Sequence, residues 1–217
     1  VPQDPTDEPA SALLQKIRTE KDRLIATGQI KRDKPLPPIT DEEKPFELPV
    51  GWEWVRLDAI SEFVNGFAFP SGQFSNDSTG VGIVKIGDIQ DGQVTTNGMS
   101  YVSQEYAKTI DMSFGVAPGD MLIAMSGATT GKLGFNSTGS HFFLNQRVGK
   151  ITLYFIDQQY AYSYLRTKVA ENLAISAGSA IPNLSTAQIK NIVFPLPPLA
   201  EQSRIVTRIT ALRRLCA

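Results

Sequence analysis

The chain has 217 residues, of which 41% are hydrophobic and 20% are charged, and this composition is typical of one folded domain with additional elements. No apolar run reaches about 18 residues and no signal-peptide pattern is present, so we expect a cytoplasmic protein without a membrane span. One cysteine, Cys216, and one histidine, His141, exclude an internal disulfide and a zinc site built from these ligands.

Charge is unevenly distributed along the chain, although the net charge is only −1. Residues 1–120 contain 11 lysines and arginines against 19 acids, whereas residues 121–217 contain 10 against 3. Such asymmetry is typical of a basic surface that meets an anionic partner, but it also fits two halves that complement each other. Both interpretations stay open at this point.

The N-terminal segment predicts a helix followed by a linker. The sequence ASALLQKIRTEKDRLIATG places Leu13 or Leu14, Ile17 and Leu24 at helical spacing, and Gly28 provides a stop. Residues 29–50 carry five prolines among acids and lysines, which excludes a helix interior or a central strand. We therefore predict a helix and an extended, proline-rich linker over residues 1–47.

Residues 48–196 predict a β-rich domain. Short β-rich runs alternate with glycine turns: WEWVRL, VGIVKIGDI, DMLIAM, KLGF, HFFLNQRVGKITLYF and NIVFPL. Between the last two runs, residues 157–177 have the apolar spacing of a helix. The predicted fold class is therefore α/β (α+β), with a globular β-rich body flanked by amphipathic helices.

Residues 197–217 predict the start of a second amphipathic helix. Ile205, Ile209, Leu212 and Cys216 recur at steps of four, three and four, which is a coiled-coil seam, although about two heptads also fit an ordinary amphipathic helix. An amphipathic helix without a partner is poorly stable in water, so each terminal helix should pack on the other, on a second copy or on sequence absent from this chain. The residues expected to face such a partner are Leu13, Ile17, Leu24, Ile205, Ile209 and Leu212.

Residues 126–134, SGATTGKLG, contain the residue types of a phosphate-binding loop without its spacing. Gly127 and Gly131 enclose three residues instead of four, and Lys132 is followed by Leu133 where a Mg²⁺-binding hydroxyl is required. We therefore predict a glycine turn between two strands rather than a nucleotide site.

Residues with a catalytic role are not evident. His141 lies beside two phenylalanines and fits a strand histidine better than a general base, and no G-x-S-x-G elbow is present. The only acid-x-Lys sequence, at residues 42–44, lies in the proline-rich linker and lacks the strand context of a metal-dependent nuclease. The sequence thus indicates a binding module without a catalytic residue, a metal or a cofactor.

Three stretches of the basic half carry side chains suited to DNA. The glycine turn offers hydroxyls and backbone amides that can approach phosphates. The run Asn145–Gln146–Arg147 carries groups that pair with adenine and guanine edges, and a strand would place Asn145 and Arg147 on one face. In the third stretch, residues 176–191, Ser185 and Gln188 equally predict a helix capping box. The candidate DNA-binding residues are Lys85, Ser126, Thr129, Thr130, Lys132, Asn145, Gln146, Arg147, Lys150, Ser179, Asn183 and Lys190.

Several phrases, in order, resemble the specificity subunit of type I restriction–modification enzymes: LPVGWEWVRLDAI, VKIGDI, GDMLIAMSGATTGKLG, LNQRVGKI and IPNLSTAQIKNIVFPLPPLAEQSRIVTRI. The resemblance runs from about residue 10 to the last residue, and the phrase with Leu-Ala-Glu-Gln and Arg-Ile-Val is its most distinctive part. One departure is Asp58-Ala59, where the family usually has Gly-Asp.

The resemblance implies a non-catalytic subunit in which residues 48–196 form a target-recognition domain that reads one half of a split DNA sequence. Residues 197–217 would begin a conserved spacer helix, part of an antiparallel coiled coil that docks the methyltransferase subunits. Methyl transfer and ATP hydrolysis belong to the modification and restriction subunits of the family. The implied partners are double-stranded DNA, both of those subunits, and a second recognition domain or another copy. Two alternatives are a helical scaffold that mainly recruits partner subunits and the recognition tail of a fused restriction–methylation enzyme.

Overall fold

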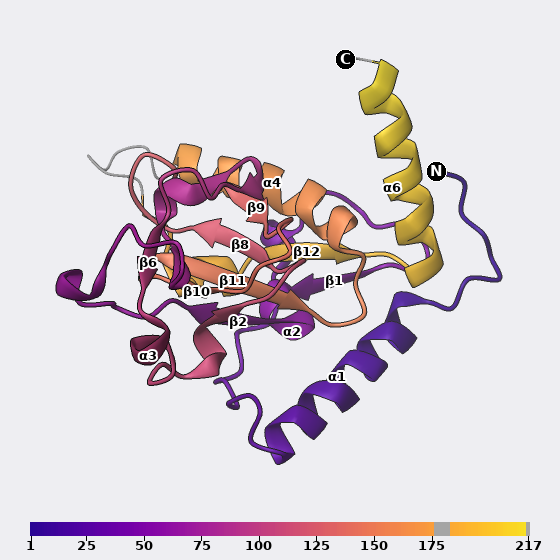
Figure 1. The fold of residues 1–217 in the computed structure, drawn as a ribbon. Helices are drawn as coiled ribbons and strands as arrows, with labels where there is room; N and C mark the ends of the chain where they lie inside the picture. The colour runs from indigo at the N-terminus through magenta and orange to yellow at the C-terminus, as the bar shows by residue number, and fades with distance from the viewer. Residues whose placement is uncertain (176–182, 216–217) are drawn as a thin grey trace. The chain divides into compact units, whose positions relative to one another are not determined.

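The computed structural model describes residues 1–175 and 183–215, and it combines helices with three β-sheets (Figure 1). The chain forms two compact units. Unit 1 consists of Val1–Ser61, Leu153–Leu165 and Lys190–Ala217, and unit 2 of Glu62–Thr152 and Arg166–Ile189. The predicted mixed class of helix and sheet is confirmed. Within the described residues, no helix is both long and apolar enough to cross a membrane.

In unit 1, α1 (Ala10–Ala26) is the predicted N-terminal helix. It ends just before Gly28, whose φ of +71° is the left-handed conformation that suits a helix stop. Leu13 and Ile17 are buried, and Leu24 is half-buried. Because α1 packs on α2 (Leu57–Ile60), the chain itself covers two of the residues expected to face a partner.

The proline-rich linker is held in place by Arg56, the last residue of β1 (Glu53–Arg56). The Arg56 guanidinium donates to both carboxylate oxygens of Glu43, at 2.6 and 2.9 Å, and to the carbonyls of Pro37 and Pro38 at 3.3 Å. Glu43 ends the 3-10 turn η1 (Asp41–Glu43) and closes a capping box with Thr40. The linker is therefore extended, as predicted, but its middle is tied to β1.

This attachment should be sensitive to acid. The hydrogen bonds from Arg56 lower the pKa of Glu43 from 4.5 to about 2. Because the folded-state pKa is the lower one, the contact contributes stability above about pH 4.5 and loses that contribution as the pH falls toward 2. We expect Glu43→Gln to lower the melting temperature by a few degrees at pH 7 and by progressively less between pH 5 and pH 2. Thermal melts across this range test the expectation, with Glu47→Gln in the same linker as control; an equal loss at every pH would contradict it.

Unit 1 also contains a two-stranded antiparallel sheet of β1 and β12 (Val193–Leu196). Phe194 of β12 is fully buried, and the rings of Tyr160 and Tyr164, from α4 (Gln158–Ile175), pack edge-on against it with centroids 5.6 and 5.2 Å away. Both tyrosine hydroxyls donate to backbone carbonyls of β12, at 2.7 and 2.9 Å. Burial raises the pKa of Tyr160, so this hydroxyl stays a donor.

The beginning of α6 (Leu199–Leu215) is fixed by two buried polar residues. The Trp52 indole N–H donates to Glu201 at 2.9 Å. Gln202 accepts from the Asp157 N–H at 2.9 Å and donates to the Pro197 carbonyl at 3.1 Å. The distinctive Leu-Ala-Glu-Gln phrase therefore joins α6 to the start of α4 and to the residue before β1.

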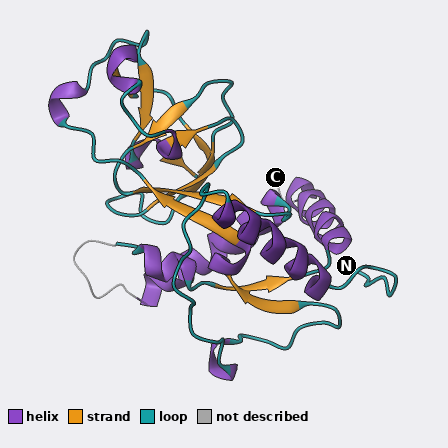
Figure 2. Cartoon of the chain, turned by 90° about the horizontal axis from the view of Figure 1, so that it is seen from below, coloured by secondary structure: helices purple, strands orange, loops and turns teal. Residues whose placement is uncertain are grey.

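Unit 2 contains a four-stranded sheet of order β6-β3-β10-β7 and a six-stranded sheet of order β2-β11-β8-β9-β5-β4. Strands are drawn as orange arrows in Figure 2. The strands are β2 (Ser61–Asn65), β3 (Val81–Val84), β4 (Ile89–Gln90), β5 (Gly92–Val94), β6 (Ser100–Val102), β7 (Gly115–Val116), β8 (Met121–Ala124), β9 (Leu133–Phe135), β10 (Phe142–Leu144) and β11 (Val148–Leu153). Its short helices are η2 (Ser71–Gln73), η3 (Ile86–Asp88), α3 (Gln104–Ala107), η4 (Met112–Phe114) and α5 (Thr186–Lys190).

The core of unit 2 follows from strand alternation. Phe142 and Leu144 of β10 pack in a cluster with Leu122 of β8 and Val148 of β11, so this cluster lies between the two sheets. Phe143, which points the other way, belongs to a second and largely aromatic cluster. Both faces of the four-stranded sheet are thus covered, and each fully buried side chain of this size contributes about 1.5–3 kcal/mol. This packed core supports the turns that join the strands of the two sheets.

Candidate nucleic-acid interface

The run Asn145–Gln146–Arg147 forms a turn between β10 and β11. The Val148 N–H donates to the Asn145 carbonyl at 3.2 Å, and Arg147 has a left-handed φ of +67°. The predicted strand, with Asn145 and Arg147 on one face, is therefore wrong. Strand alternation stops because the chain leaves the four-stranded sheet here and enters the six-stranded sheet. As a result, Gln146 and Arg147 are both exposed.

Three other segments of unit 2 hold the backbone of this turn. The Asn145 N–H donates to the last carbonyl of β3 at 3.0 Å, and the Gln146 N–H donates to the Phe67 carbonyl at 2.8 Å. The Arg147 carbonyl accepts from the Met125 N–H at 2.9 Å. Because its backbone is bonded on three sides, the turn has little freedom to change conformation.

Polar residues beside two of these segments, and from the segment 183–186, lie near the turn. Ser126 pairs through a β-bridge with Asn183, and the Thr186 hydroxyl donates to the Asn65 side chain at 3.0 Å. We call this group the polar rim, defined as Asn65, Ser126, Asn145, Gln146, Arg147, Asn183 and Thr186. Its side chains are amides, hydroxyls and one guanidinium, and none of the seven is a carboxylate.

Two buried atoms of the polar rim lack a hydrogen-bond partner in the described part of the chain, the Ser126 hydroxyl and the Asn145 side-chain carbonyl. An unsatisfied buried polar group costs about 1–3 kcal/mol and is rare in folded proteins. An ordered water is the usual partner of such buried groups.

The segment SGATTGKLG forms the predicted glycine turn between two strands, here β8 and β9. Gly127 and Gly131 have left-handed φ values of +79° and +85°. The Thr129 hydroxyl donates to the Ile86 carbonyl at 2.7 Å, and the Thr130 hydroxyl donates to the Gly127 carbonyl at 2.6 Å. Both hydroxyls therefore help to fix the shape of the turn. Lys132 is half-buried and donates to Gln90 of β4 at 3.0 Å.

Two other predicted DNA-binding lysines of unit 2 have internal partners. The Lys85 ammonium donates to the Ser100 hydroxyl at 2.7 Å and lies 3.9 Å from the ring centroid of Phe74. The Lys150 ammonium donates to the Gly115 carbonyl at 2.6 Å. Among the residues that the structure describes, neither ammonium forms a hydrogen bond with the polar rim.

Lys190 is the last residue of α5 and belongs to unit 1. It pairs with Asp33 of the linker and with Asp58 of α2, the latter at 3.2 Å. Burial by itself would lower the pKa of Lys190, but the hydrogen bonds and charges of the two carboxylates raise it above its ordinary value. Ser179 lies outside the described residues. The capping box predicted for Ser185 and Gln188 is confirmed at the start of α5.

Sequence reasoning missed three residues of this region, Asn65, Gly66 and Thr186. Gly66 follows β2, and a Cβ atom there would lie only 1.9 Å from the Asn145 carbonyl oxygen. The backbone of β2 can approach the turn only because residue 66 has no side chain. An Asn-Gly pair directly after a β-rich run was the available signal, since this dipeptide commonly marks a turn.

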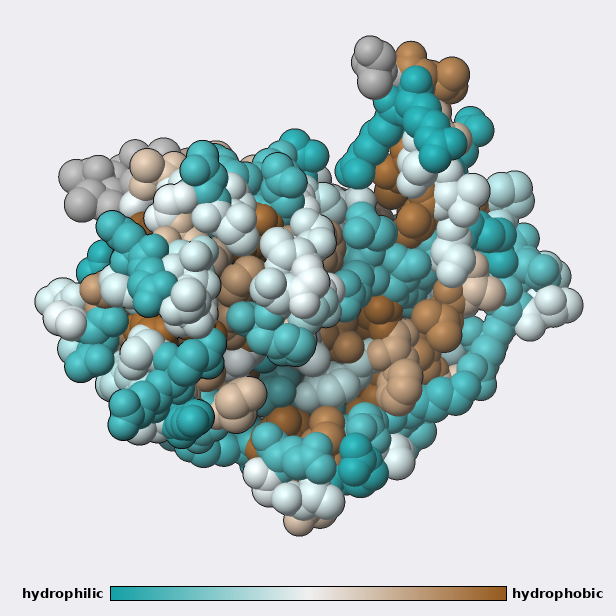
Figure 3. All heavy atoms as spheres, in the orientation of Figure 1, coloured by the Kyte–Doolittle hydropathy of each residue, from teal (hydrophilic) through white to brown (hydrophobic). Residues whose placement is uncertain are grey.

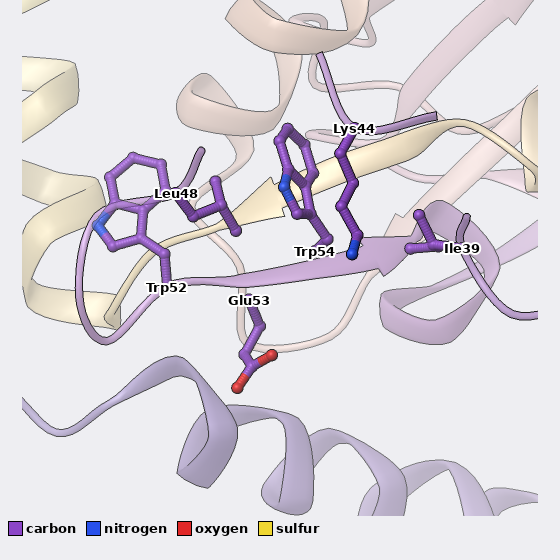
Figure 4. A pocket seen from close by; sticks show the side chains of 6 residues that line it. All are labelled: Ile39, Lys44, Leu48, Trp52, Glu53 and Trp54. Carbon is purple, nitrogen blue, oxygen red and sulfur yellow. The ribbon is translucent and has the colours of Figure 1, made fainter. Parts of the chain in front are cut away.

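Unit 1 contains a pocket of a different character, about 450 Å³ in volume (Figure 4). In the close-up, both indoles, Leu48 and Lys44 lie on one side of β1, whereas Glu53 points away from them toward α1. Lys44 is paired with Asp41 at 2.6 Å. The residues lining the pocket are Ile39, Lys44, Leu48, Trp52, Glu53 and Trp54. This pocket combines two indoles and two aliphatic side chains with a lysine and a glutamate, and its lining has no amide like those of the polar rim.

The fold and the polar rim define a mixed helix-and-sheet protein that presents hydrogen-bonding side chains from rigid turns. The family described as type I restriction modification DNA specificity domain matches residues 49–217. The chain belongs to this family.

Individual relatives agree with this assignment. The chain is 37% identical to the type I restriction enzyme EcoAI specificity subunit of Escherichia coli and 31% identical to the EcoEI specificity subunit of the same organism. Both matches cover 100% of this chain but only 37% and 38% of those proteins. The chain therefore spans less than two fifths of the length of these relatives.

Solved structures share the fold. The HsdS subunit from Thermoanaerobacter tengcongensis superimposes with a TM-score of 0.63 at 21% identity, covering 94% of this chain and 49% of that one. A structure described as showing complex assembly and conformational transition of the type I R-M system gives a TM-score of 0.64 at 20% identity. That match covers 94% of this chain and 50% of the other.

Proposed function

We propose that this chain reads one half of a bipartite sequence in double-stranded DNA and directs methyltransferase and restriction subunits to it. In this proposal the chain is non-catalytic, needs no cofactor and works in the cytoplasm. The observation that carries the proposal is the polar rim, which lies on rigid turns of a chain that belongs to a DNA specificity family. Residues 48–196 would act as the target-recognition domain, between the segments 1–47 and 197–217.

The chemistry of the polar rim suits a DNA groove. Amide side chains pair bidentately with adenine, and a guanidinium pairs bidentately with guanine. Hydroxyls and backbone N–H groups contact phosphates, which fixes the position of a protein along the duplex. The absence of carboxylates among the seven residues avoids repulsion by the phosphates.

The other candidate residues are proposed as contacts with the phosphate backbone. Three of these candidates donate a hydrogen bond to another group of the chain: Lys85, Lys150 and Lys190. A contact with phosphate would therefore replace that internal bond. Lys132 would exchange its bond to Gln90. The remaining candidates of this kind are Thr129, Thr130 and Ser179.

An exchange experiment tests the proposed function. Residues 48–196 are replaced by the matching segment of the EcoAI relative, and methylated adenines are mapped in DNA from cells that express the complete system. We expect one half of the methylated motif to change and the other half to stay. An unchanged motif would refute the proposal.

Binding of DNA should also depend strongly on salt. Each neutralised phosphate adds about −0.9 to the slope of log affinity against log salt concentration, so contacts by three or four cations predict a slope of about −3. Fluorescence anisotropy with a labelled duplex and the assembled complex measures this slope between about 50 and 200 mM salt. An affinity that does not change with salt would contradict phosphate contacts.

A second function, recruitment of partner subunits, is favoured by the exposed apolar residues of α6. Leu212 and Leu215 are 46% and 82% exposed, while Ile205 and Ile209 are half-buried. Figure 3, which has the orientation of Figure 1, shows hydrophobic residues in brown along α6. We propose that this stripe, with Leu24 of α1, packs against helices of a methyltransferase subunit, of a second recognition domain or of another copy. Cys216, the next residue of the seam, lies outside the described residues.

A further inference from the structure

Arg147 differs from the other arginine of unit 2 in its lack of an internal partner. Arg166 forms an ion pair with Asp91 at 2.7 Å. The Arg147 guanidinium is exposed, and among the described residues no acceptor lies within hydrogen-bonding distance of it. Binding a ligand through Arg147 would therefore break no existing contact.

The backbone at Arg147 is fixed in a conformation that an arginine adopts at a cost. Its φ of +67° lies in the left-handed region, which glycine and asparagine occupy far more readily. Three neighbouring segments nevertheless hold the turn through hydrogen bonds, and Gly66 packs directly beneath it. When a protein keeps a non-glycine residue in such a costly backbone conformation, the side chain of that residue commonly has a function.

The neighbours of Arg147 suit a base edge better than a phosphate. Phosphate oxygens only accept hydrogen bonds, so a phosphate site needs donors and cations. The polar rim has one cation, Arg147, among amides and hydroxyls, so it lacks the several cations of a phosphate site. Base edges in the major groove display donors as well as acceptors, and N7 and O6 of guanine together match the fork of a guanidinium.

We propose that Arg147 pairs bidentately with N7 and O6 of one guanine in the major groove and thereby determines one base pair of the half-site. This inference rests on the DNA-reading function proposed above. The rigid turn supplies the placement, and the guanidinium supplies the two donors.

The test uses the assembled complex with its methyltransferase subunits and a duplex library randomised over the half-site. Bound sequences are selected and counted for the wild type, Arg147→Ala and Arg147→Gly. We expect the wild type to require a guanine at one position, and both variants to lose about ten-fold or more of the preference at that position alone. Arg147→Gly suits the left-handed turn and should keep the melting temperature, so its loss of preference cannot come from misfolding. Arg166→Ala, in the same unit, is the matched control and should leave every preference unchanged.

Two results would overturn the inference and leave the proposed function intact. Unchanged preferences in both Arg147 variants would show that the side chain reads no base. Equal weakening on all sequences, with a salt slope smaller by about one, would assign Arg147 to a phosphate. A wild-type complex without any sequence preference would instead refute the proposed function.

Discussion

Replacing Gly66 with alanine is expected to lower the melting temperature by about 10 °C and to abolish sequence preference on DNA. The new Cβ atom would lie 1.9 Å from the carbonyl oxygen and 2.4 Å from the carbonyl carbon of Asn145. Both are backbone atoms, so no change of side-chain rotamer relieves the clash. Overpacking of this kind costs about 3 kcal/mol, and each kcal/mol shifts the melting temperature of a protein of this size by about 2–4 °C.

The loss of preference follows from the same displacement. Gly66 donates to the Val148 carbonyl at 2.9 Å, so the alanine pushes the end of β2 away from the start of β11 and from the turn that carries Gln146 and Arg147. Gly139→Ala is the matched control, because a Cβ atom at residue 139 would meet no atom within 4 Å. Thermal melts and the library selection are measured on both variants. Equal melting temperatures, or a Gly66→Ala variant with the wild-type motif, would show that the close approach does not matter.

The polar rim could be recognised only in part from the sequence, because four separate segments build it. The runs around Ser126 and Asn145 were found since several polar residues follow one another there. Asn65 and Thr186 are isolated polar residues, and nothing local indicates that they touch across 121 positions of the chain. Their proximity depends on the sheet order β2-β11-β8 and on the bridge between Ser126 and Asn183, which are long-range features.

Elements with a strong local pattern were predicted well. Apolar spacing located α1, α4 and α6, and glycines at both ends located β8 and β9. The turn at Asn145–Arg147 was missed because it interrupts a continuous β-rich run, and because Arg147 replaces the glycine or asparagine that normally marks a left-handed residue. The rule that glycine or asparagine marks a left-handed residue is a local one, and it fails here at Arg147, a position that we propose to be functional.

The uneven charge along the chain is now partly explained by ion pairs between its two halves. Basic residues of the second half pair with acids of the first: Lys150 with Asp120, Arg166 with Asp91, Lys190 with Asp33 and Asp58, and Arg204 with Asp7. Complementarity within the chain therefore accounts for several of the basic residues. Arg147 takes part in none of these ion pairs, whereas Lys150 and Lys190 would exchange theirs for a phosphate in the proposed reading of DNA.

If α6 packs on a methyltransferase subunit as proposed, placing arginines at Ile209 and Leu212 is expected to weaken that assembly by about a hundred-fold or more. Each guanidinium buried without a partner in a helical interface costs several kcal/mol, and every 1.4 kcal/mol changes the affinity about ten-fold. The isolated chain should keep its melting temperature, because Leu212 is 46% exposed and Ile209 is half-buried before any partner binds. Size-exclusion chromatography and binding titrations with the partner subunit measure the loss.

The matched control is Thr207→Arg with Thr210→Arg, which adds the same charge to exposed positions of α6. These positions lie on the side of the helix away from the apolar stripe, since successive residues are about 100° apart. Assembly lost only in the first variant shows that the stripe forms the contact. Assembly kept in the first variant would remove α6 as the partner helix, whereas equal loss in both would assign the effect to charge alone. Because the arginines leave unit 2 untouched, any free chain should keep the DNA preference of the wild type, which separates recruitment from reading.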